Sequence, residues 1–473
     1  MSTQVIIAIC FIAFLLLFAV VGIYSATKKQ NNTTDYLLAG RNVNPWLTGL
    51  SAFATSHSGG MFISTIGFTY QAGISSVWLL LGWFLGDYLA WFIVHKPLRE
   101  VSEENQSETI GSFLNNNCKQ NRSIAIISAL ITILFLGAYA AAQLIAGGKA
   151  LYAVFGWDYS FGIIVGAIIV ILYCFSGGIR ASIWTDAVQA VVMMFSMLML
   201  LVVSIAACGG MGELWRQLEQ TDPALINPVP PNLQFGFGLF LLSWLCAGFG
   251  VVGQPHIMVR AMVLDSSKNM ALARNIYAVL YIIFSAAAIG IALAARVLIP
   301  DLITNGDPEL ALPQMAMQLL PAVWVGVILA GVFSAVVSTA DSQILSCSAA
   351  LSQDIFPETA HSYKLAKLAT LTVTVIVLTI ALASDKNMFA LGVFAWSALA
   401  SALGPLLVLR AWKCPVSPAV GVTMMLGGIT VAAVWNAVLG LSNSIYEVLP
   451  GMAAGLLIYL CCLLLKPKKK SLL

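Results

Sequence analysis

One stretch inside an apolar segment carries an unusual number of oxygen-bearing side chains: AVVSTADSQ, residues 335–343. Four of its residues follow an i, i+3, i+4, i+7 spacing and therefore share one helical face: Ala335, Ser338, Thr339 and Ser342. Asp341 lies at the edge of this face, and a carboxylate inside a membrane is costly and by default functional. Hydroxyl, carbonyl and carboxylate oxygens are the ligands that a small hard cation such as Na+ prefers. The stretch therefore predicts an ion site, although the same hydroxyls could instead bond to the preceding turn and allow close helix packing.

The composition is that of a polytopic membrane protein. Hydrophobic residues make up 60% of the 473 residues and charged residues only 9%, whereas a soluble protein needs far more charge to cover its surface. About thirteen apolar runs are long enough to cross a bilayer. They lie at 4–26, 46–72, 74–95, 123–155, 158–177, 183–208, 235–259, 275–299, 314–347, 368–384, 387–409, 417–441 and 446–465. The polar intervals between them are loop-sized, so no soluble domain is expected.

The distribution of basic residues predicts the orientation in the membrane. With the N-terminus outside and thirteen crossings, 19 of the 23 Lys and Arg residues face the cytoplasm, as the positive-inside rule requires. The basic C-terminal KPKKK is then a cytoplasmic anchor on anionic lipid, and not a nucleic-acid patch. Because Lys28 and Lys29 follow the first apolar run rather than precede it, this run is expected to be an uncleaved span in the plasma (inner) membrane.

Two spans contain helix-breaking residues at mid-depth. The second contains SAFATSHSGGMF and the seventh AGFGVVGQPH. Glycine weakens a helix and proline removes a backbone hydrogen bond, and unwound backbone persists in a membrane only where protein or a cavity satisfies it. Taken singly, either set of glycines could serve helix packing alone. The two breaks are separated by five spans, an odd number, so two five-helix copies must be inverted relative to each other, which is the plan of transporters with a midplane site.

Motifs spread over about residues 35–360 resemble those of the sodium:solute symporter family, most closely its sodium/proline branch: DYLLAGR at 35–41, LSAFATSHSGG at 50–60, GGIRASIWTDAVQA at 177–190, GQPHIMVRAM at 253–262, and STADSQIL at 338–345 with SQDIF after it. The resemblance implies an all-α membrane protein with a LeuT-type 5+5 inverted repeat and about thirteen transmembrane helices. The corresponding division is residues 1–45 for the first extra helix and its loop, 46–210 and 211–412 for the two repeats, and 413–473 for two C-terminal helices with the basic tail.

The same resemblance implies two ion sites. The family's sodium site corresponds to the backbone carbonyls of Ala54, His57 and Ala335 and the hydroxyls of Ser338 and Thr339. A second site found in some members corresponds to Asp186, Ser338, Asp341 and Ser342. Two carboxylates exceed the minimum for one cation, so either they bind strongly or one of them stays protonated.

The solute site departs from the proline branch. Ser56 stands where that branch has an aspartate, and Ala247 and Val251 replace aromatic residues of the seventh span, although Gln254 and Pro255 match. The polar residues of the fourth span are Tyr139 and Gln143, with no arginine among them.

An anionic group of the solute is expected at the backbone amides of the unwound second span, near Ser58, Gly59 and Gly60. Asp87 of the third span could accept the ammonium of a zwitterion, or could instead face a water-filled vestibule. His256 and Arg260 are expected as interfacial anchors at the cytoplasmic end of the seventh span.

The resulting hypothesis is a secondary transporter in which inward Na+ flow drives uptake of a small polar solute by alternating access. The expected solute is an amino acid, proline-like or another zwitterion. Alternatives are coupling to H+ through Asp186 and Asp341, or a monocarboxylate, osmolyte or sugar acid as solute. An enzyme is not expected, because the chain has four histidines, no H-E-x-x-H motif and no identifiable base for Ser58. A monomer embedded in the bilayer is sufficient for this function, and the sequence leaves the oligomeric state, the exact solute and the number of Na+ ions open.

Overall fold

The computed structural model describes residues 2–28, 30, 32–116, 121–231, 233–302, 307–359, 362–384, 388–442 and 444–465. Several residues on which the sequence analysis relied lie outside the described residues: Lys29, Lys119, His361, Lys386 and the basic tail from Lys466. The described chain is helical throughout, with a single isolated β-bridge between Val43 and Leu264.

The described residues of the first half form ten α-helices: α1 (Thr3–Ala26), α2 (Thr33–Leu38), α3 (Pro45–Ser56), α4 (Gly59–Ala72), α5 (Val77–Ala90), α6 (Lys96–Glu104), α7 (Ile110–Leu114), α8 (Ser123–Ile131), α9 (Gly137–Phe155) and α10 (Tyr159–Ala207). The second half continues with α11 (Met211–Thr221), α12 (Gly236–Phe249), α13 (Pro255–Val263), α14 (Met270–Leu298), α16 (Ala311–Leu319), α17 (Ala322–Ala349), α18 (Tyr363–Ala383), α19 (Met388–Ala411), α20 (Pro418–Ala433) and α21 (Val448–Leu464).

Ten helical runs of the described residues are long and apolar enough to span a membrane, and two shorter apolar helices cover Tyr159–Leu172 and Val448–Leu464. The prediction of a polytopic all-α protein is therefore confirmed. α10 merges two predicted spans, but its backbone is not helical at Gly178 (φ 58°, ψ −146°), where the chain changes direction. A positive φ of this kind is accessible to glycine at little cost.

The predicted single run 314–347 is divided in the structure. α16 ends at Leu319, Leu320 is extended (φ −113°, ψ 145°), and α17 begins after Pro321. The residue before a proline is disfavoured in the helical region, so the chain breaks here. The membrane-spanning helix therefore starts at Ala322, later than the apolar pattern suggests.

Both predicted helix breaks are present. α3 ends at Ser56, His57 has non-helical dihedrals (φ −92°, ψ 72°), and α4 begins at Gly59. In the seventh span a 3₁₀ turn over Gly250–Gly253 and an extended Gln254 separate α12 from α13.

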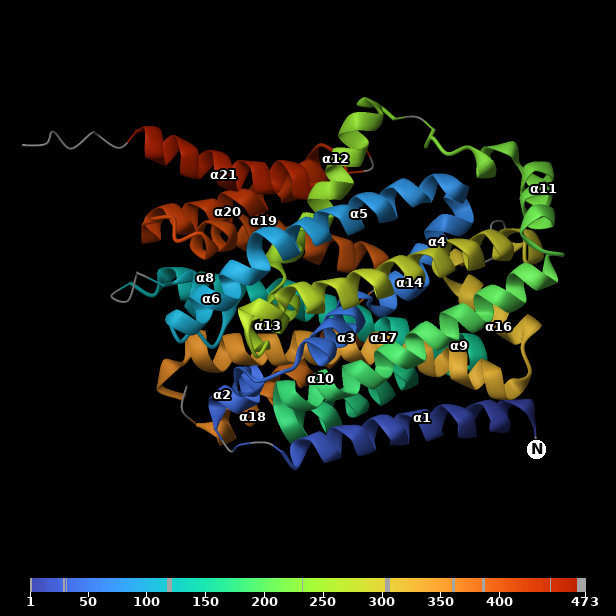
Figure 1. The fold of residues 1–473 in the computed structure, drawn as a ribbon, viewed down its shortest axis with the longest axis horizontal. Helices are drawn as coiled ribbons and strands as arrows, with labels where there is room; N and C mark the ends of the chain where they lie inside the picture. Colours follow the sequence, from blue (N-terminus) through green and yellow to red (C-terminus); the bar gives the residue numbers. More distant parts are fainter. Residues whose placement is uncertain are drawn as a thin grey trace, which may run out of the picture.

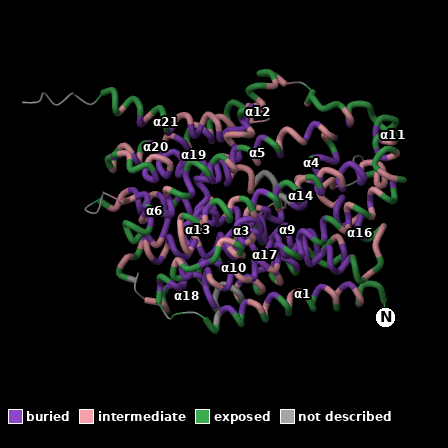
Figure 2. Tube along the Cα trace, viewed as in Figure 1, coloured by how far each residue is buried: buried purple, intermediate pink, exposed green. Residues whose placement is uncertain are grey.

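α17 lies at the centre of the molecule. Figure 1 shows α3, α9, α10 and α17 in the middle of the bundle and α1 along one edge, and Figure 2 shows the buried residues concentrated around the central helices. The first break packs directly on α17, because a Cβ added at Gly59 would lie 2.5 Å from Cγ2 of Val336. Oxygen-bearing side chains of α17 are consequently buried against other helices rather than exposed to lipid.

Candidate functional site

The hydroxyl-bearing face of α17 meets the end of α3. The Ser338 hydroxyl donates to the Ala54 carbonyl at 3.0 Å and lies 3.3 Å from the Ala335 carbonyl, while the Thr339 hydroxyl donates to the Thr55 carbonyl at 3.1 Å. All of these residues are buried. The Ala54 and Thr55 carbonyls are available because they belong to the last turn of α3, and the last four carbonyls of a helix have no intrahelical donor. The end of α3 and the middle of α17 thus form a cluster of neutral oxygens, at the negative end of the α3 dipole.

His57, at the break itself, contributes its ring to packing. Its imidazole Nδ1 lies 3.0 Å from the Phe53 carbonyl, and its ring centroid lies 4.6 Å from that of Tyr281 and 4.8 Å from that of Phe284. Only the His57 carbonyl belonged to the predicted ion site, and its side chain lies in this aromatic cluster instead.

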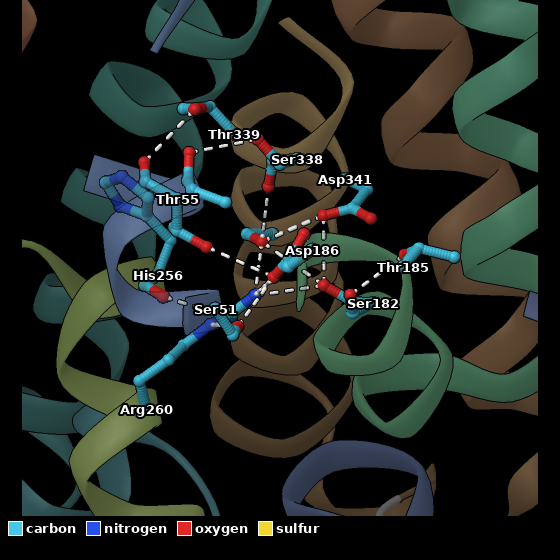
Figure 3. Close-up of polar contacts among 12 residues, drawn as sticks. Ser51, Thr55, Ser182, Thr185, Asp186, His256, Arg260, Ser338, Thr339 and Asp341 are labelled. Carbon is cyan, nitrogen blue, oxygen red and sulfur yellow. Dashed lines mark hydrogen bonds and ion pairs between the residues drawn. The ribbon is translucent and has the colours of Figure 1, made fainter. Parts of the chain in front are cut away.

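A second, charged cluster lies next to the first. Figure 3 shows Arg260 of α13 reaching toward Asp186 of α10. One terminal nitrogen of Arg260 lies 3.0 Å from Asp186 Oδ2, 2.9 Å from the Ser182 hydroxyl and 2.5 Å from the Ser342 hydroxyl, while Nε donates to the Ser51 hydroxyl at 3.2 Å. Ser51 in turn donates to Asp186 at 2.6 Å. Four helices therefore meet around one guanidinium group.

Asp341 belongs to the same cluster. Its Oδ1 accepts from the Ser182 hydroxyl at 3.0 Å and from the Ser342 hydroxyl at 2.8 Å. Two residues link this cluster to the neutral oxygens: Thr55, whose hydroxyl lies 3.3 Å from Asp186 Oδ2, and Ser342, whose hydroxyl lies 2.7 Å from the Ser338 carbonyl. The predicted members of the second ion site are therefore brought together.

The expectation that His256 and Arg260 are interfacial anchors is wrong, because each is only 1% exposed. α13 begins inside the protein, directly after the break at Gln254, so its polar side chains point into the bundle rather than toward lipid headgroups. A signal existed in the sequence, since an arginine buried in a membrane needs a carboxylate partner and two intramembrane carboxylates need a cation. Three serine and threonine partners in this cluster were not singled out from the sequence: Ser51, Thr55 and Ser182.

A cavity lies beside the first break and has a volume of about 980 Å³ including its open mouth. Most predicted solute-site residues line it: Ser56, Ser58, Gly60, Asp87, Tyr139 and Gln143. Gly59 does not line it directly, but its backbone N–H donates to Gln143 Oε1 at 3.0 Å. The start of α4 and the middle of α9 therefore form one wall of the cavity.

Val251, Gln254 and Pro255 do not line this cavity, so their predicted direct contact with solute is not supported by their positions. The Gln254 side-chain amide donates to the Trp396 carbonyl at 3.0 Å, which attaches the second break to α19. Pro255 instead lines a separate hollow of about 500 Å³, which also reaches Ser342. The second break thus contacts the cavity indirectly, through Trp396, whose ring lines it.

Asp87 is 3% exposed, so it is enclosed by protein rather than placed in an open vestibule. One of its carboxylate oxygens, Oδ2, accepts a short hydrogen bond from the Tyr277 hydroxyl of α14. Tyr277 and its neighbour Tyr281 both line the cavity and were not singled out from the sequence, because tyrosines at helical spacing are more often part of the core.

Comparison with known sequences places the chain in a family. The sequence model of the sodium:solute symporter family matches residues 36–414. The high-affinity proline transporter PutP of Bacillus subtilis (strain 168) is 30% identical over 445 residues, covering 92% of this chain and 93% of the relative. The sodium/proline symporter of Staphylococcus aureus (strain JH9) is 30% identical over 484 residues, covering 97% of this chain and 91% of the relative.

Solved structures show the same fold. A substrate-bound, outward-open Na+-coupled sialic acid symporter has a TM-score of 0.79 at 20% identity and covers 96% of this chain and 97% of its own. MhsT in complex with L-phenylalanine has a TM-score of 0.57 at 15% identity, with coverages of 89% and 98%. These are transporters of the LeuT-type fold. The chain therefore belongs to the sodium:solute symporter family and is a Na+-coupled secondary transporter, a multi-pass protein of the plasma membrane.

Proposed function

We propose that this symporter couples inward Na+ flow to the uptake of a small zwitterionic solute, an amino acid, by alternating access. The observation that carries the proposal is the contact between α17 and the broken second span, where the Ser338 hydroxyl lies within 3.3 Å of two backbone carbonyls. The solute class is supported by relatives named for proline and by a cavity that combines one carboxylate with backbone amides at a helix start.

The proposed Na+ ligands are the carbonyls of Ala54, His57 and Ala335 and the hydroxyls of Ser338 and Thr339. In the structure these hydroxyls donate to carbonyls of α3. When Na+ binds, each hydroxyl turns its hydrogen away and offers a lone pair, so the ion replaces the hydrogen bonds as the link between α3 and α17. Each Na+ that enters down a 100 mV potential releases about 2.3 kcal/mol before its concentration gradient is counted.

A second ion site is proposed at Asp186, Ser338, Asp341 and Ser342, with Arg260 as a resident of the same cluster. If both carboxylates are ionised, the guanidinium balances one of them, and one further monovalent cation neutralises the cluster. Na+ would make this a two-sodium transporter, whereas H+ would make the same residues a proton site. The hollow beside Pro255 reaches Ser342 and offers this cation a way out of the protein.

For the solute, we propose that the start of α4, at Ser58, Gly59 and Gly60, holds the carboxylate group and that Asp87 holds the ammonium group. Ser56, Tyr139 and Gln143 are proposed as polar contacts on the cavity wall. Val251, Gln254 and Pro255 are proposed to act on the solute indirectly, by positioning α19 and its Trp396.

We also propose the full topology of about thirteen membrane helices, with the N-terminus outside, the C-terminus in the cytoplasm, and repeat boundaries at 46–210 and 211–412. In Figure 1, α11 and α16 lie at the same end of the bundle as the start of α1, and α2, α6 and α8 lie at the opposite end.

The protein acts as a transporter rather than an enzyme, with the bilayer and a small solute as its partners, and a monomer is sufficient for transport.

The test is solute uptake into proteoliposomes driven by an imposed Na+ gradient, with proline, other neutral amino acids, betaine, monocarboxylates and sugars as a panel. We expect saturable uptake of an amino acid that stops when choline replaces Na+. Ser338→Ala should raise the half-saturating Na+ concentration about tenfold or more, because it removes one ion ligand. Ser334→Ala is the matched control, since Ser334 lies one turn earlier on α17 and its hydroxyl donates to the Ala330 carbonyl of its own helix.

Accumulation that is unchanged in choline would overturn the proposal. Uptake that follows an imposed pH gradient at constant Na+ would replace it with the proton-coupled alternative.

A further inference from the structure

Two buried oxygen atoms of the cavity, Asp87 Oδ1 and Tyr281 Oη, have no hydrogen-bond partner among the described residues, and a third, Ser56 Oγ, has only the Tyr277 hydroxyl beside it. They come from three different helices, α5, α3 and α14. A buried polar atom left without a partner costs free energy, so such atoms are rare in native proteins and call for an explanation. A ligand that donates hydrogen bonds to all three would remove this cost.

The three oxygens lie around one tyrosine. The Tyr277 hydroxyl donates to the other oxygen of the Asp87 carboxylate and lies close to Ser56. The ring of Tyr281 lies 5.9 Å from that of Tyr277, and the Asp87 carboxylate interacts electrostatically with Tyr281. Asp87 carries the only formal charge among the described residues that line the cavity. This end of the cavity is therefore rich in acceptors and negatively charged.

An unpartnered donor lies on the wall formed by α9 and the start of α4. Gln143 Oε1 accepts the Gly59 backbone N–H at 3.0 Å, which orients the amide so that Nε2 is the free end, and Nε2 has no partner among the described residues. Nε2 therefore lies beside the start of α4, where the first backbone N–H groups of the helix also lack intrahelical acceptors. This wall therefore supplies hydrogen-bond donors to the cavity, while Asp87, Ser56 and Tyr281 supply acceptors.

We propose that the transported solute carries a primary ammonium group, whose three N–H bonds are accepted by Asp87, Ser56 and Tyr281, while its carboxylate is held by Gln143 and the start of α4. This inference rests on the proposed function and narrows its solute class. A primary ammonium has three donors for three acceptors, whereas the secondary amine of proline has two and a quaternary ammonium has none. The transporter is thus specific for primary-amine amino acids.

The apolar part of the solute faces aromatic rings. The ring centroid of Trp83 lies 5.0 Å from that of Trp396 and 6.1 Å from that of Trp244, and all three rings line the cavity. The indole N–H of Trp396 donates to the Ala247 carbonyl at 3.0 Å, so its polar edge is already satisfied. Aromatic faces could also attract a quaternary ammonium by cation–π interaction, and the test below separates that case.

The experiment is competition for Na+-driven uptake in proteoliposomes, supported by Na+-dependent thermal stabilisation of the purified full-length protein. The probes are L-alanine, L-leucine and L-phenylalanine, the N-methyl form of each, L-proline and glycine betaine. We expect at least one primary-amine amino acid to bind, and its N-methyl form to bind about tenfold more weakly, because a charge-assisted hydrogen bond is lost.

An N-methyl form that binds at least as tightly as its parent amino acid overturns the inference. Proline or betaine that binds at least as tightly as the best primary-amine amino acid overturns it too. So does Na+-driven uptake confined to solutes without an amine, although the proposed Na+ coupling would then still stand. If no solute accumulates in a Na+-dependent manner, the proposed function fails as well.

Variants locate the ammonium group. Asp87→Asn should weaken binding of primary and N-methyl amines alike, because it removes the charge that both require. Tyr281→Phe keeps the ring and removes one acceptor, so it should reduce the preference for the primary amine and leave the affinity for the N-methyl form within about twofold. Tyr88→Phe is the matched control, since Tyr88 follows Asp87 directly but does not line the cavity. A preference that survives Tyr281→Phe unchanged contradicts the three-acceptor arrangement even if Asp87→Asn does not fold.

Discussion

Replacing Arg260 by glutamine should destabilise the protein strongly. The guanidinium group contacts Asp186 and the hydroxyls of Ser51, Ser182 and Ser342, and it also donates to the His256 carbonyl at 3.1 Å. Its removal leaves buried carboxylates without a counter-charge. Breaking a buried ion pair in this way typically costs about 3–5 kcal/mol.

Two further variants test the physical origin of this cost. Arg260→Gln combined with Asp186→Asn should recover more than half of the lost stability, because the second change removes the unpaired charge. Arg216→Gln is the matched control: Arg216 pairs with Glu213 at an exposed position on α11, where solvent screens the ion pair and its loss should barely change stability.

The assay is thermal unfolding of the purified variants in detergent, with NaCl exchanged for choline chloride at constant ionic strength. Na+ that takes the place of the guanidinium should stabilise Arg260→Gln more than it stabilises the wild type, since a ligand that binds only the folded state raises its stability. The role of Arg260 as a buried counter-charge is contradicted if Arg260→Gln unfolds at the wild-type temperature. It is also contradicted if the double variant unfolds at a lower temperature than the single one.

Three other predictions concern the contact between Gly59 and α17, the ion pairs of Lys149 and the number of coupled Na+ ions. Gly59→Ala should reduce uptake about tenfold or more, because its Cβ would lie 2.5 Å from Val336 on α17, whereas Gly137→Ala, which meets nothing within 4 Å, should leave uptake unchanged. Lys149→Gln breaks the ion pairs with Asp307 and Glu309 and should speed hydrogen exchange at the backbone amides of Asp307, Glu309 and Leu310, with exchange in α18 as the internal reference. If two Na+ ions are coupled, the Hill slope of uptake against Na+ should exceed one and Asp186→Asn should lower it toward one, whereas a slope of one that Asp186→Asn leaves unchanged contradicts coupling to a second ion at this site.

The parts of the site that depend on local pattern were predictable from the sequence. Ser338 and Thr339 share a face with Ala335 because helical spacing dictates it, and the break at His57 follows from the glycines after it. Both features need only the residues of one segment.

The parts that depend on tertiary contacts were not predictable in the same way. The sequence alone suggests that Arg260 is an interfacial residue. Its burial follows from the break at Gln254, which makes α13 start inside the bundle. Likewise, Gln254 contacts α19 rather than the cavity, and only the packing of the second break against Trp396 decides this. Pro321, by contrast, was a local signal for the start of α17 that the apolar run obscured.

The last turn of α3 connects the proposed Na+ site to the cavity proposed to hold the solute. Three consecutive residues serve three sites: the Ala54 carbonyl contacts Ser338, Thr55 contacts both Thr339 and Asp186, and Ser56 lines the cavity. A Na+ ion that fixes Ala54 against α17 therefore also fixes Ser56, one of the proposed acceptors for the ammonium group. Because binding linkage is reciprocal, solute must raise the affinity for Na+ by the same factor by which Na+ raises the affinity for solute. In this proposal, one turn of helix provides that linkage without requiring the ion and the solute to touch.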